Sequence, residues 1–302
     1  MLNRIAVLSI ATLMAASAQT PQIVNEVRSA IDAKDFARGQ QALDRARKAT
    51  GVTPEWVLAY SWMGRGHLAA KHWDEADKYA AETRNFVLPM LKKRKLDDDK
   101  WLPLALGASI EVQALVYQAR GERIEAVAFL RGELVQWKDT SIRTRIQKDL
   151  NVVSLVGKRA PVLSTAEFVG AQPPALAALK GRTVLLFFWA HWCGDCKGEA
   201  ETIARIAKDL PGVAVIGPTQ TYGYAAGGAD VKRPEELKYI EQVRQKYYGS
   251  IRGMSVPVSE ENMKIWGVST TPTLAVINKQ GFVVLYHPGR MTYEELLPYV
   301  RN

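Results

Sequence analysis

The fold of this chain is constrained most strongly by an apolar run followed directly by a pair of cysteines. Residues 183–190, Thr-Val-Leu-Leu-Phe-Phe-Trp-Ala, show no polar alternation, and such a run of strand length predicts a central strand covered on both faces. Cys193 and Cys196 follow at once, and residues 199–210 then show apolar residues at helical spacing. The pattern therefore predicts a buried strand that leads into a helix, with both cysteines at the first turn of that helix.

The two cysteines are the only ones among 302 residues. Secreted proteins stabilised by disulfides carry several widely spaced cysteines, and a bridge that closes so small a loop constrains almost no chain entropy. A cysteine at a helix N-terminus is stabilised as the thiolate by the unpaired N–H groups and the helix dipole. We therefore expect a redox pair, with Cys193 as an exposed attacking thiol and Cys196 as a buried thiol that resolves the mixed disulfide.

A metal site is the alternative interpretation of the same pair. A closed tetrahedral site needs four ligands, and the chain has no second cysteine pair and only four histidines. We expect neither a metal nor another cofactor. A copper metallochaperone that uses Cys193, Cys196 and His287 as ligands stays open as a second function.

The rest of the C-terminal half alternates between strand and helix patterns. We expect strands at residues 213–216, 273–277 and 282–286, and helices at residues 235–247 and 292–300. Residues 278–281, Asn-Lys-Gln-Gly, form a hairpin signal between the last two strands. Thr292 and Glu295 have the spacing of a capping box at the start of the closing helix. This order of elements predicts an α/β sandwich.

The N-terminal half, residues 21–150, has apolar residues at helical spacing and almost no strand pattern. A short turn that opens a helix recurs at residues 34–39, 71–76 and 121–126, with Gly39, Ala76 and Ala126 in the same phase. The pattern resembles tetratricopeptide (TPR) helical hairpins, whose period is near 34 residues. The resemblance implies a docking surface for a partner protein, and a plain helical domain without a partner is the alternative.

The residues around the cysteines carry a more specific resemblance. Residues 187–197, Phe-Phe-Trp-Ala-His-Trp-Cys-Gly-Asp-Cys-Lys, closely resemble the thioredoxin active-site segment. Residues 270–273, Thr-Thr-Pro-Thr, resemble the cis-proline loop that faces the cysteines in that fold. The resemblance implies a thioredoxin-like α/β/α sandwich after the all-α domain. It also implies that Thr271 and Pro272 form a substrate-docking surface. Because Trp192 directly precedes the nucleophile, we expect it to shield Cys193 or to contact the substrate.

Residues 156–302 resemble the TlpA/ResA-type branch of exported thioredoxin-like proteins. Val156–Pro161 is similar to the Gly-Lys-x-Ala-Pro opening of that branch, and Leu179–Arg182 is similar to its Leu-Lys-Gly-Lys segment. Glu199, three residues after Cys196, matches a glutamate of that branch implicated in proton transfer at the cysteines. An ordinary first-turn acid favoured by the helix dipole is the alternative for this residue. The resemblance implies reductive exchange with exported protein substrates, fed by an upstream thiol–disulfide donor.

The chain departs from thioredoxin near the cysteines. Phe187 occupies the position of a buried aspartate, and Asp195 adds a negative charge that opposes thiolate formation. His191 either stabilises a thiolate when protonated or is an exposed loop histidine without that role. Residues 217–233 form a long loop with glycines and tyrosines, which either rims the active site or is a disordered surface insertion. These departures leave the direction of electron flow open.

The first residues have the pattern of a signal peptide. Arg4 precedes an apolar run at residues 5–14, and Ala16-Ser17-Ala18 has the small-x-small form of a cleavage site. The run is shorter than the roughly 20 residues that span a bilayer, and an uncleaved anchoring helix is the alternative. The expected organisation is a signal peptide at residues 1–18, a helical TPR-like domain at 19–150 and a thioredoxin-like domain at 151–302. We expect an exported, periplasmic protein that does not span the membrane after cleavage.

The formal net charge of +9 is not concentrated in one stripe. The basic cluster Lys92–Lys95 is followed by Asp97–Asp99, which largely cancels it. We therefore expect no nucleic-acid partner. The expected partners are protein thiols and disulfides, an upstream donor and a possible protein at the helical domain. A scaffold in which the helical domain acts and the redox domain is vestigial is the third function considered.

Overall fold

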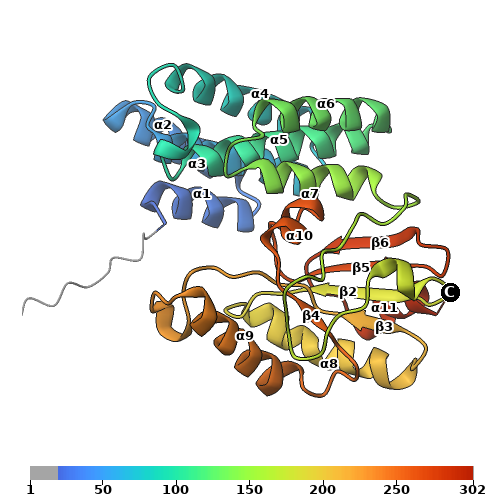
Figure 1. The fold of residues 1–302 in the computed structure, drawn as a ribbon. Coiled ribbons are helices and arrows are strands. Elements are labelled where there is room, and N and C mark those ends of the chain that lie inside the picture. The colour runs from blue at the N-terminus through green and yellow to red at the C-terminus, as the bar shows by residue number, and fades with distance from the viewer. Residues whose placement is uncertain (1–19, 302) are drawn as a thin grey trace, which may run out of the picture.

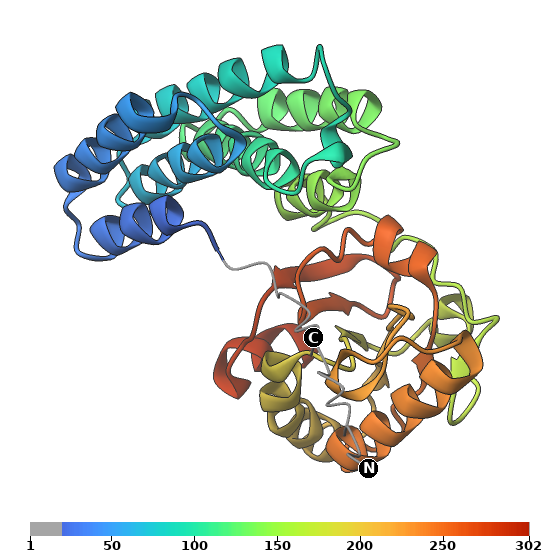
Figure 2. The same ribbon diagram turned by 90° about the vertical axis from the view of Figure 1, so that its left-hand side faces the viewer.

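The computed structural model describes residues 20–301, which form a helical lobe and an α/β lobe (Figure 1). The expected signal peptide, residues 1–18, lies outside the described residues. The helices of the first lobe are α1 (Gln22–Asp32), α2 (Phe36–Thr50), α3 (Pro54–Ala69), α4 (Trp73–Met90), η1 (Leu96–Asp98), α5 (Leu102–Ala119), α6 (Arg123–Gln136) and α7 (Arg143–Ser154). Successive helices pack side by side in this lobe, as Figure 2 shows from a second side.

Three helical hairpins share one kind of turn. Lys34, Lys71 and Gly121 occupy the same place in the turns before α2, α4 and α6, with φ of 57°, 62° and 82°. The small residues in the matching phase, Gly39, Ala76 and Ala126, are all buried. A Cβ on Gly39 would lie 2.9 Å from the Sδ of Met63 on α3 and 3.6 Å from the Cβ of Ala30 on α1, so any larger residue requires the Met63 side chain to move. The repeated turn predicted from the sequence is therefore present as a repeated helix–turn–helix.

The second lobe is built on a four-stranded sheet with the order β3-β2-β5-β6. Its strands are β2 (Val184–Phe188), β3 (Ala214–Ile216), β5 (Thr273–Ile277) and β6 (Val283–Pro288). Its helices are η2 (Leu176–Leu179), α8 (Gly194–Asp209), η3 (Ala226–Gly228), α9 (Arg233–Tyr248), α10 (Glu260–Ile265) and α11 (Tyr293–Val300). β2 is parallel to β3 and antiparallel to β5, and β5 is antiparallel to β6. All the strands and helices expected in this half are confirmed, with small shifts at their ends.

Two short strands, helix α10 and the short helices η2 and η3 of this lobe have no counterpart among the expected elements. β1 (Phe168–Val169) and β4 (Val256–Pro257) pair with each other in a separate two-stranded sheet. A strand of two residues is too short for an alternating pattern to appear in the sequence. Helix α10 has only six residues, which is less than two turns. A helix this short is also too short for the helical spacing of apolar residues to appear in the sequence.

Strand β2 is buried along its whole length. Leu185 and Phe187 contribute to a core shared with α8, α9 and α11. Leu186 and Phe188 contribute to a core on the opposite face, which contains Trp266 from the end of α10. The absence of polar alternation in the sequence thus reflects burial of both faces, and the lobe is an α/β/α sandwich.

Helix α7 connects the two lobes and lies against α10 (Figure 1). The side-chain amide of Asn151 donates to the carbonyl of Trp266 at 2.8 Å, and the Tyr286 hydroxyl donates to the same carbonyl at 2.8 Å. The helix runs to Ser154, and Leu155 beyond it belongs to the core of the α/β lobe. We therefore propose that the domain boundary follows the end of α7 rather than residue 150.

A buried cluster of charged residues lies between α5 and α7. Glu111 pairs with Arg145 and accepts from the Nζ of Lys148 at 2.9 Å. Lys148 Nζ also lies 3.0 Å from Asp149 Oδ1, whereas Asp149 Oδ2 has no hydrogen-bond partner among the described residues. Burial raises the pKa of the Asp149 carboxyl to about 7, although Lys148 opposes that rise.

Asp149→Asn is expected to flatten the pH dependence of the free energy of unfolding. The folded state holds the Asp149 proton up to about pH 7, while an unperturbed aspartate loses it at 3.8. Binding of this proton therefore contributes fully to the free energy of unfolding below about pH 4. That contribution is lost as the pH rises from there through 7. Between pH 4 and pH 8 the free energy of unfolding should therefore fall by about 4 kcal/mol more in the wild type than in the variant, as measured by urea denaturation.

The exposed Asp139 provides the matched control for this prediction. Asp139→Asn removes the same charge from the same lobe without removing a buried carboxyl, so its stability should follow the wild-type pH curve. If Asp149→Asn also follows that curve, the buried carboxyl is not the group that titrates.

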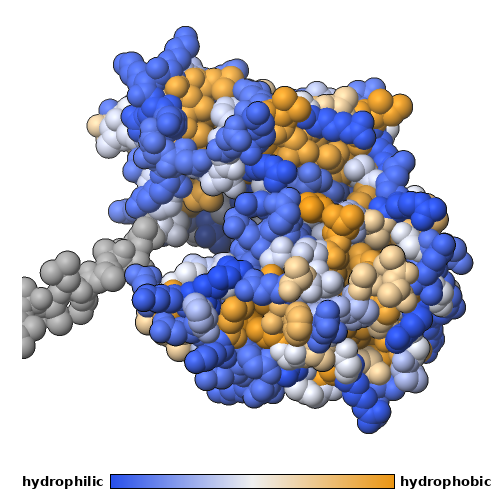
Figure 3. All heavy atoms as spheres, in the orientation of Figure 1, coloured by the Kyte–Doolittle hydropathy of each residue, from blue (hydrophilic) through white to orange (hydrophobic). Residues whose placement is uncertain are grey.

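The surface seen in Figure 3 is mixed in polarity over both lobes, because hydrophilic side chains interrupt each apolar patch. Within residues 20–301, no helix combines the length and the apolar character needed to cross a membrane. Among the large apolar side chains that are exposed is Trp192, which lies next to the cysteines.

Candidate active site

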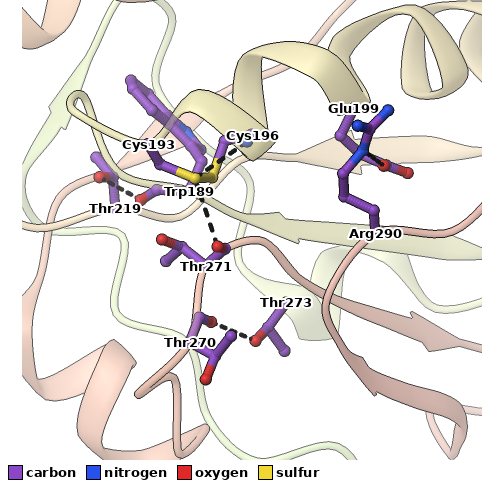
Figure 4. The surroundings of a disulfide bond; sticks show 9 residues. All are labelled: Trp189, Cys193, Cys196, Glu199, Thr219, Thr270, Thr271, Thr273 and Arg290. Carbon is purple, nitrogen blue, oxygen red and sulfur yellow. Dashed lines mark hydrogen bonds and ion pairs between the residues drawn. A yellow bond between two sulfur atoms is a disulfide. The ribbon is translucent and has the colours of Figure 1, made fainter. Parts of the chain in front are cut away.

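Cys193 and Cys196 lie where β2 leads into α8. Cys193 is the N-cap residue of α8, and its Sγ accepts the backbone N–H of Cys196 at 3.0 Å. The two sulfurs are joined in a disulfide (Figure 4). A backbone N–H at a helix N-terminus that points at a sulfur stabilises the thiolate once the disulfide is reduced.

The expectation that Cys193 is exposed is wrong for this oxidised form. Cys193 is 3% exposed and Cys196 is 0% exposed. The Cys193 sulfur lies 3.4 Å from the carbonyl oxygen of Thr271, on a loop that is distant in sequence. The facing loop therefore covers the sulfur that we expect to attack.

The loop that faces the disulfide contains a cis peptide bond between Thr271 and Pro272. The Thr273 hydroxyl donates to the Thr270 carbonyl at 2.7 Å, which ties the loop to the start of β5. Figure 4 shows the Thr271 carbonyl directed at the cysteine pair. The structure thus brings Thr271 and Pro272 beside the cysteines, which is the position that the resemblance to thioredoxin implied for them.

Glu199 is fully buried on α8, so it is not a solvated first-turn acid. Its carboxylate pairs with the Nε of Arg290 at 3.3 Å and accepts the backbone N–H of Met291 at 3.4 Å (Figure 4 shows the ion pair). Burial raises the pKa of Glu199, while the Met291 N–H and the Arg290 guanidinium oppose the rise. Sequence reasoning missed Arg290, because no local pattern links it to a residue so far away along the chain.

His191 is buried, which contradicts the expectation of an exposed loop histidine. Its side chain is 1% exposed, and its Nε2 lies 3.1 Å from Oε1 of Glu236 on α9. Burial lowers the pKa of His191, although Glu236 opposes this shift. A histidine that is neutral near pH 7 does not supply the positive charge that would stabilise a neighbouring thiolate.

The loop at residues 217–233 is ordered by its contacts with the active-site segment. The Thr219 hydroxyl donates to the Trp189 carbonyl at 2.8 Å, and the Trp189 indole N–H donates to the Gly217 carbonyl at 2.9 Å. The Tyr222 ring packs edge-on against Trp192, with ring centroids 5.7 Å apart. The loop therefore borders the active site and is not a disordered insertion.

The two departures next to the cysteines differ in their surroundings. Phe187 is fully buried and packs edge-on against Tyr248, whereas Asp195 is exposed in the first turn of α8. Among residues 20–301, no group of three or more His, Cys, Asp and Glu side chains has the arrangement of a metal site. His287, the third ligand of the metallochaperone alternative, has its Nε2 3.2 Å from the Arg290 carbonyl.

About half of this chain is similar to known proteins. The profile of a family described as a thioredoxin-like domain matches residues 174–302. The thiol:disulfide interchange protein DsbE of Xylella fastidiosa is 29% identical over 153 residues, covering 48% of this chain and 69% of that protein. The thiol-disulfide oxidoreductase ResA of Bacillus anthracis is 27% identical over 149 residues, covering 49% and 78%. A solved thiol:disulfide interchange protein of Chlorobium tepidum is 22% identical, with a TM-score of 0.37, covering 48% and 94%.

The matched residues fall within the α/β lobe, and the helical lobe precedes them. The curated relatives are named as thiol:disulfide oxidoreductases and interchange proteins. This chain carries the cysteine pair at a helix start, as that chemistry requires. Residues 174–302 are therefore a thioredoxin-like domain, and the chain is similar over about half its length to proteins named as thiol:disulfide oxidoreductases and interchange proteins.

Proposed function

We propose that this protein reduces disulfides in exported proteins, with Cys193 as the attacking thiol and Cys196 as the resolving thiol. The observation that carries the proposal is the position of Cys193 at the N-cap of α8, with its sulfur 3.4 Å from the Thr271 carbonyl. The names of the relatives support exchange between thiols and disulfides. The reductive direction rests on the resemblance to TlpA/ResA-type proteins.

The proposed reaction is two successive thiol–disulfide exchanges. The Cys193 thiolate attacks one sulfur of the substrate disulfide, forms a mixed disulfide and releases the other substrate sulfur as a thiolate, which takes up a proton. Cys196 then loses its proton and attacks the Cys193 sulfur, which forms the Cys193–Cys196 disulfide and releases the second substrate thiolate. Two electrons pass to the substrate, and an upstream dithiol donor returns the enzyme to its reduced form.

The neighbouring residues have distinct roles in this proposal. The backbone of Thr271 pairs with the substrate, and Pro272 shapes that docking surface. Trp192 is half exposed beside the nucleophile, so it contacts the substrate. Glu199 accepts the proton of Cys196, because it is a buried base one turn further along α8.

Glu199→Gln is expected to slow oxidation of the reduced enzyme by a protein disulfide at least about tenfold at pH 7. Because its pKa is raised, the carboxylate acts as a base only above that raised value. The wild-type rate should therefore show an ionisation that the glutamine variant lacks. Stopped-flow tryptophan fluorescence across a pH series measures both properties.

The exposed Glu201 on the same helix gives the control for this prediction. Glu201→Gln should keep the wild-type rate and pH profile. A wild-type profile in Glu199→Gln would show that the buried carboxylate takes no part in proton transfer.

The proposed function is tested by the reduction potential of the Cys193–Cys196 couple, together with insulin reduction in the presence of dithiothreitol. A potential near the thioredoxin value of roughly −270 mV supports a reductant, and one near about −120 mV supports an oxidant. A pair that neither titrates with a glutathione buffer nor reduces insulin would rule out thiol–disulfide exchange.

We also propose that the protein is exported to the periplasm after removal of residues 1–18. N-terminal sequencing of the mature protein should then begin at Gln19. The three helical hairpins support a second role for the helical lobe as a docking surface for a protein partner. That role predicts that a captured partner cross-links to α1–α6 of the full-length chain rather than to the α/β lobe.

A further inference from the structure

One buried carboxylate, that of Glu236, joins the active-site segment to the loop at residues 217–233. Its Oε1 accepts the backbone N–H of Tyr222 and lies 3.1 Å from the His191 ring, and its Oε2 accepts the backbone N–H of Gly223 at 2.8 Å. A carboxylate that is removed from water stays in place only where donors replace the lost hydration. Here the donors come from two separate segments, so the carboxylate holds those segments together.

His191 is held in this arrangement by polar and aromatic contacts. Because burial lowers its pKa, the ring is neutral near pH 7, and its Nε2 proton is directed at Glu236. The rings of Tyr222, Tyr224 and Tyr239 pack edge-on around the imidazole, with centroid distances of 5.3, 5.2 and 5.3 Å. His191 is two residues before Cys193, so these contacts place the tyrosine rings of the loop close to the nucleophile.

Aromatic side chains form the outer edge of the same arrangement. Trp192 is 51% exposed and contacts Tyr222 edge-on, and Tyr222 lies 6.2 Å from Tyr224 between ring centroids. We call Trp192, Tyr222 and Tyr224 the aromatic rim. The loop at residues 217–233 is also tied to its own end, because Nη1 of Arg233 donates to the Thr221 hydroxyl at 2.7 Å. The rim is therefore a preformed surface next to the cysteine pair.

We propose that Glu236 is a positioning residue that holds the aromatic rim beside Cys193, and that the rim selects protein disulfides with apolar side chains next to the reacting cysteine. This inference rests on the proposed thiol–disulfide exchange and names its substrate class. Aromatic rings bury apolar side chains of a partner with little loss of conformational entropy. The rim residues do not take part in the transfer of electrons between the sulfurs. The rim therefore affects how tightly the substrate binds and not the rate of thiol–disulfide exchange.

The test uses Glu236→Gln and two peptides that share one disulfide but carry leucine or serine beside the cysteine. Glutamine keeps the size of the side chain but turns one acceptor oxygen into an NH2 group facing a donor, so at least one bond is lost. Wild type should favour the leucine peptide about tenfold in kcat/KM, which corresponds to about 1.4 kcal/mol. Glu236→Gln should lose most of this preference through a higher KM, with kcat within about twofold of wild type. The equilibrium constant of the cysteine pair with glutathione, which gives the reduction potential, should also stay within about twofold.

Matched variants separate the rim from a general structural effect. Glu235→Gln changes the exposed neighbour on α9 and keeps a side chain that caps the helix, so it should behave as wild type. Tyr222→Ala removes a ring of the rim but keeps the backbone N–H that Glu236 accepts. It should therefore show the same loss of preference even if Glu236→Gln folds poorly.

Each outcome has a distinct meaning. A fall in kcat with no change in preference, or an unchanged preference in both rim variants, would overturn the rim proposal. A fivefold slower reaction of Glu236→Gln with a small polar disulfide such as hydroxyethyl disulfide would also overturn it, because that disulfide has no apolar side chain for the rim to bind. Failure of the wild type to react with any of these disulfides would instead contradict the proposed function.

Discussion

Cys193→Ser is expected to abolish disulfide reduction, whereas Cys196→Ser is expected to stop the reaction after a single attack. Serine does not ionise near neutral pH and forms no disulfide, so loss of Cys193 removes the first step entirely. Loss of Cys196 leaves the attacking thiol at the N-cap of α8 but removes the group that releases the product. Turnover of insulin should fall by at least about 10³-fold in both variants.

Intact-mass spectrometry distinguishes the roles of the two cysteines. Cys196→Ser should accumulate a stable mixed disulfide with a peptide substrate. Cys193→Ser should form none, since Cys196 is fully buried inside the first turn of α8 whereas Cys193 is the N-cap residue at its start. An adduct on Cys193→Ser alone would reverse the two roles. Full insulin reduction by both variants would exclude the pair as the redox centre.

Gly267→Ala is expected to lower the free energy of unfolding by about 3 kcal/mol. Gly267 has a φ of +64°, and a Cβ there would lie 2.5 Å from the backbone nitrogen of Lys148 on α7. The left-handed conformation costs an L-residue about 1–2 kcal/mol, and displacement of packed atoms costs about 1–3 kcal/mol more. Since Lys148 belongs to the helix that joins the lobes, the two lobes should also begin to unfold in separate transitions.

Gly281→Ala measures the cost of the left-handed backbone conformation without the steric contact that is present at Gly267. Gly281 has a φ of +85°, and a Cβ there would meet no heavy atom within 4 Å among residues 20–301. Gly281→Ala should therefore cost only about 1–2 kcal/mol and leave a single transition. Urea denaturation followed by tryptophan fluorescence and circular dichroism measures both variants. Equal losses would show that the contact with α7 adds nothing to stability.

Several features near the active site were accessible from the sequence because they depend on residues close together along the chain. The unbroken apolar run of β2 and the two cysteines after it indicated a buried strand and a helix start, and both are present. The capping box of Thr292 and Glu295 and the repeated turns of the helical lobe are also present. Such features follow from local periodicity and from hydrogen bonds that span a few residues.

The environment of each active-site group was decided by the tertiary structure. Cys193 is covered by Thr271, Glu199 is buried against Arg290, and the expected loop histidine is enclosed by a helix and a loop. The hydrogen-bonding or ion-pair partners lie between 45 and 91 residues away along the chain, at Glu236, Thr271 and Arg290. Helical and strand periodicities relate residues only a few positions apart, so they do not indicate which of these distant residues meet.

The sequence by itself determined the type of chemistry, because the spacing of two cysteines and the helix that follows them are local properties. It did not determine which side chains are removed from water around them. Burial depends on how β2, α8, α9 and the loops between them fold together, and burial sets both the proton affinity of Glu199 and the neutral form of His191. The sequence therefore indicated which residues react, and the tertiary structure decided which residues position them.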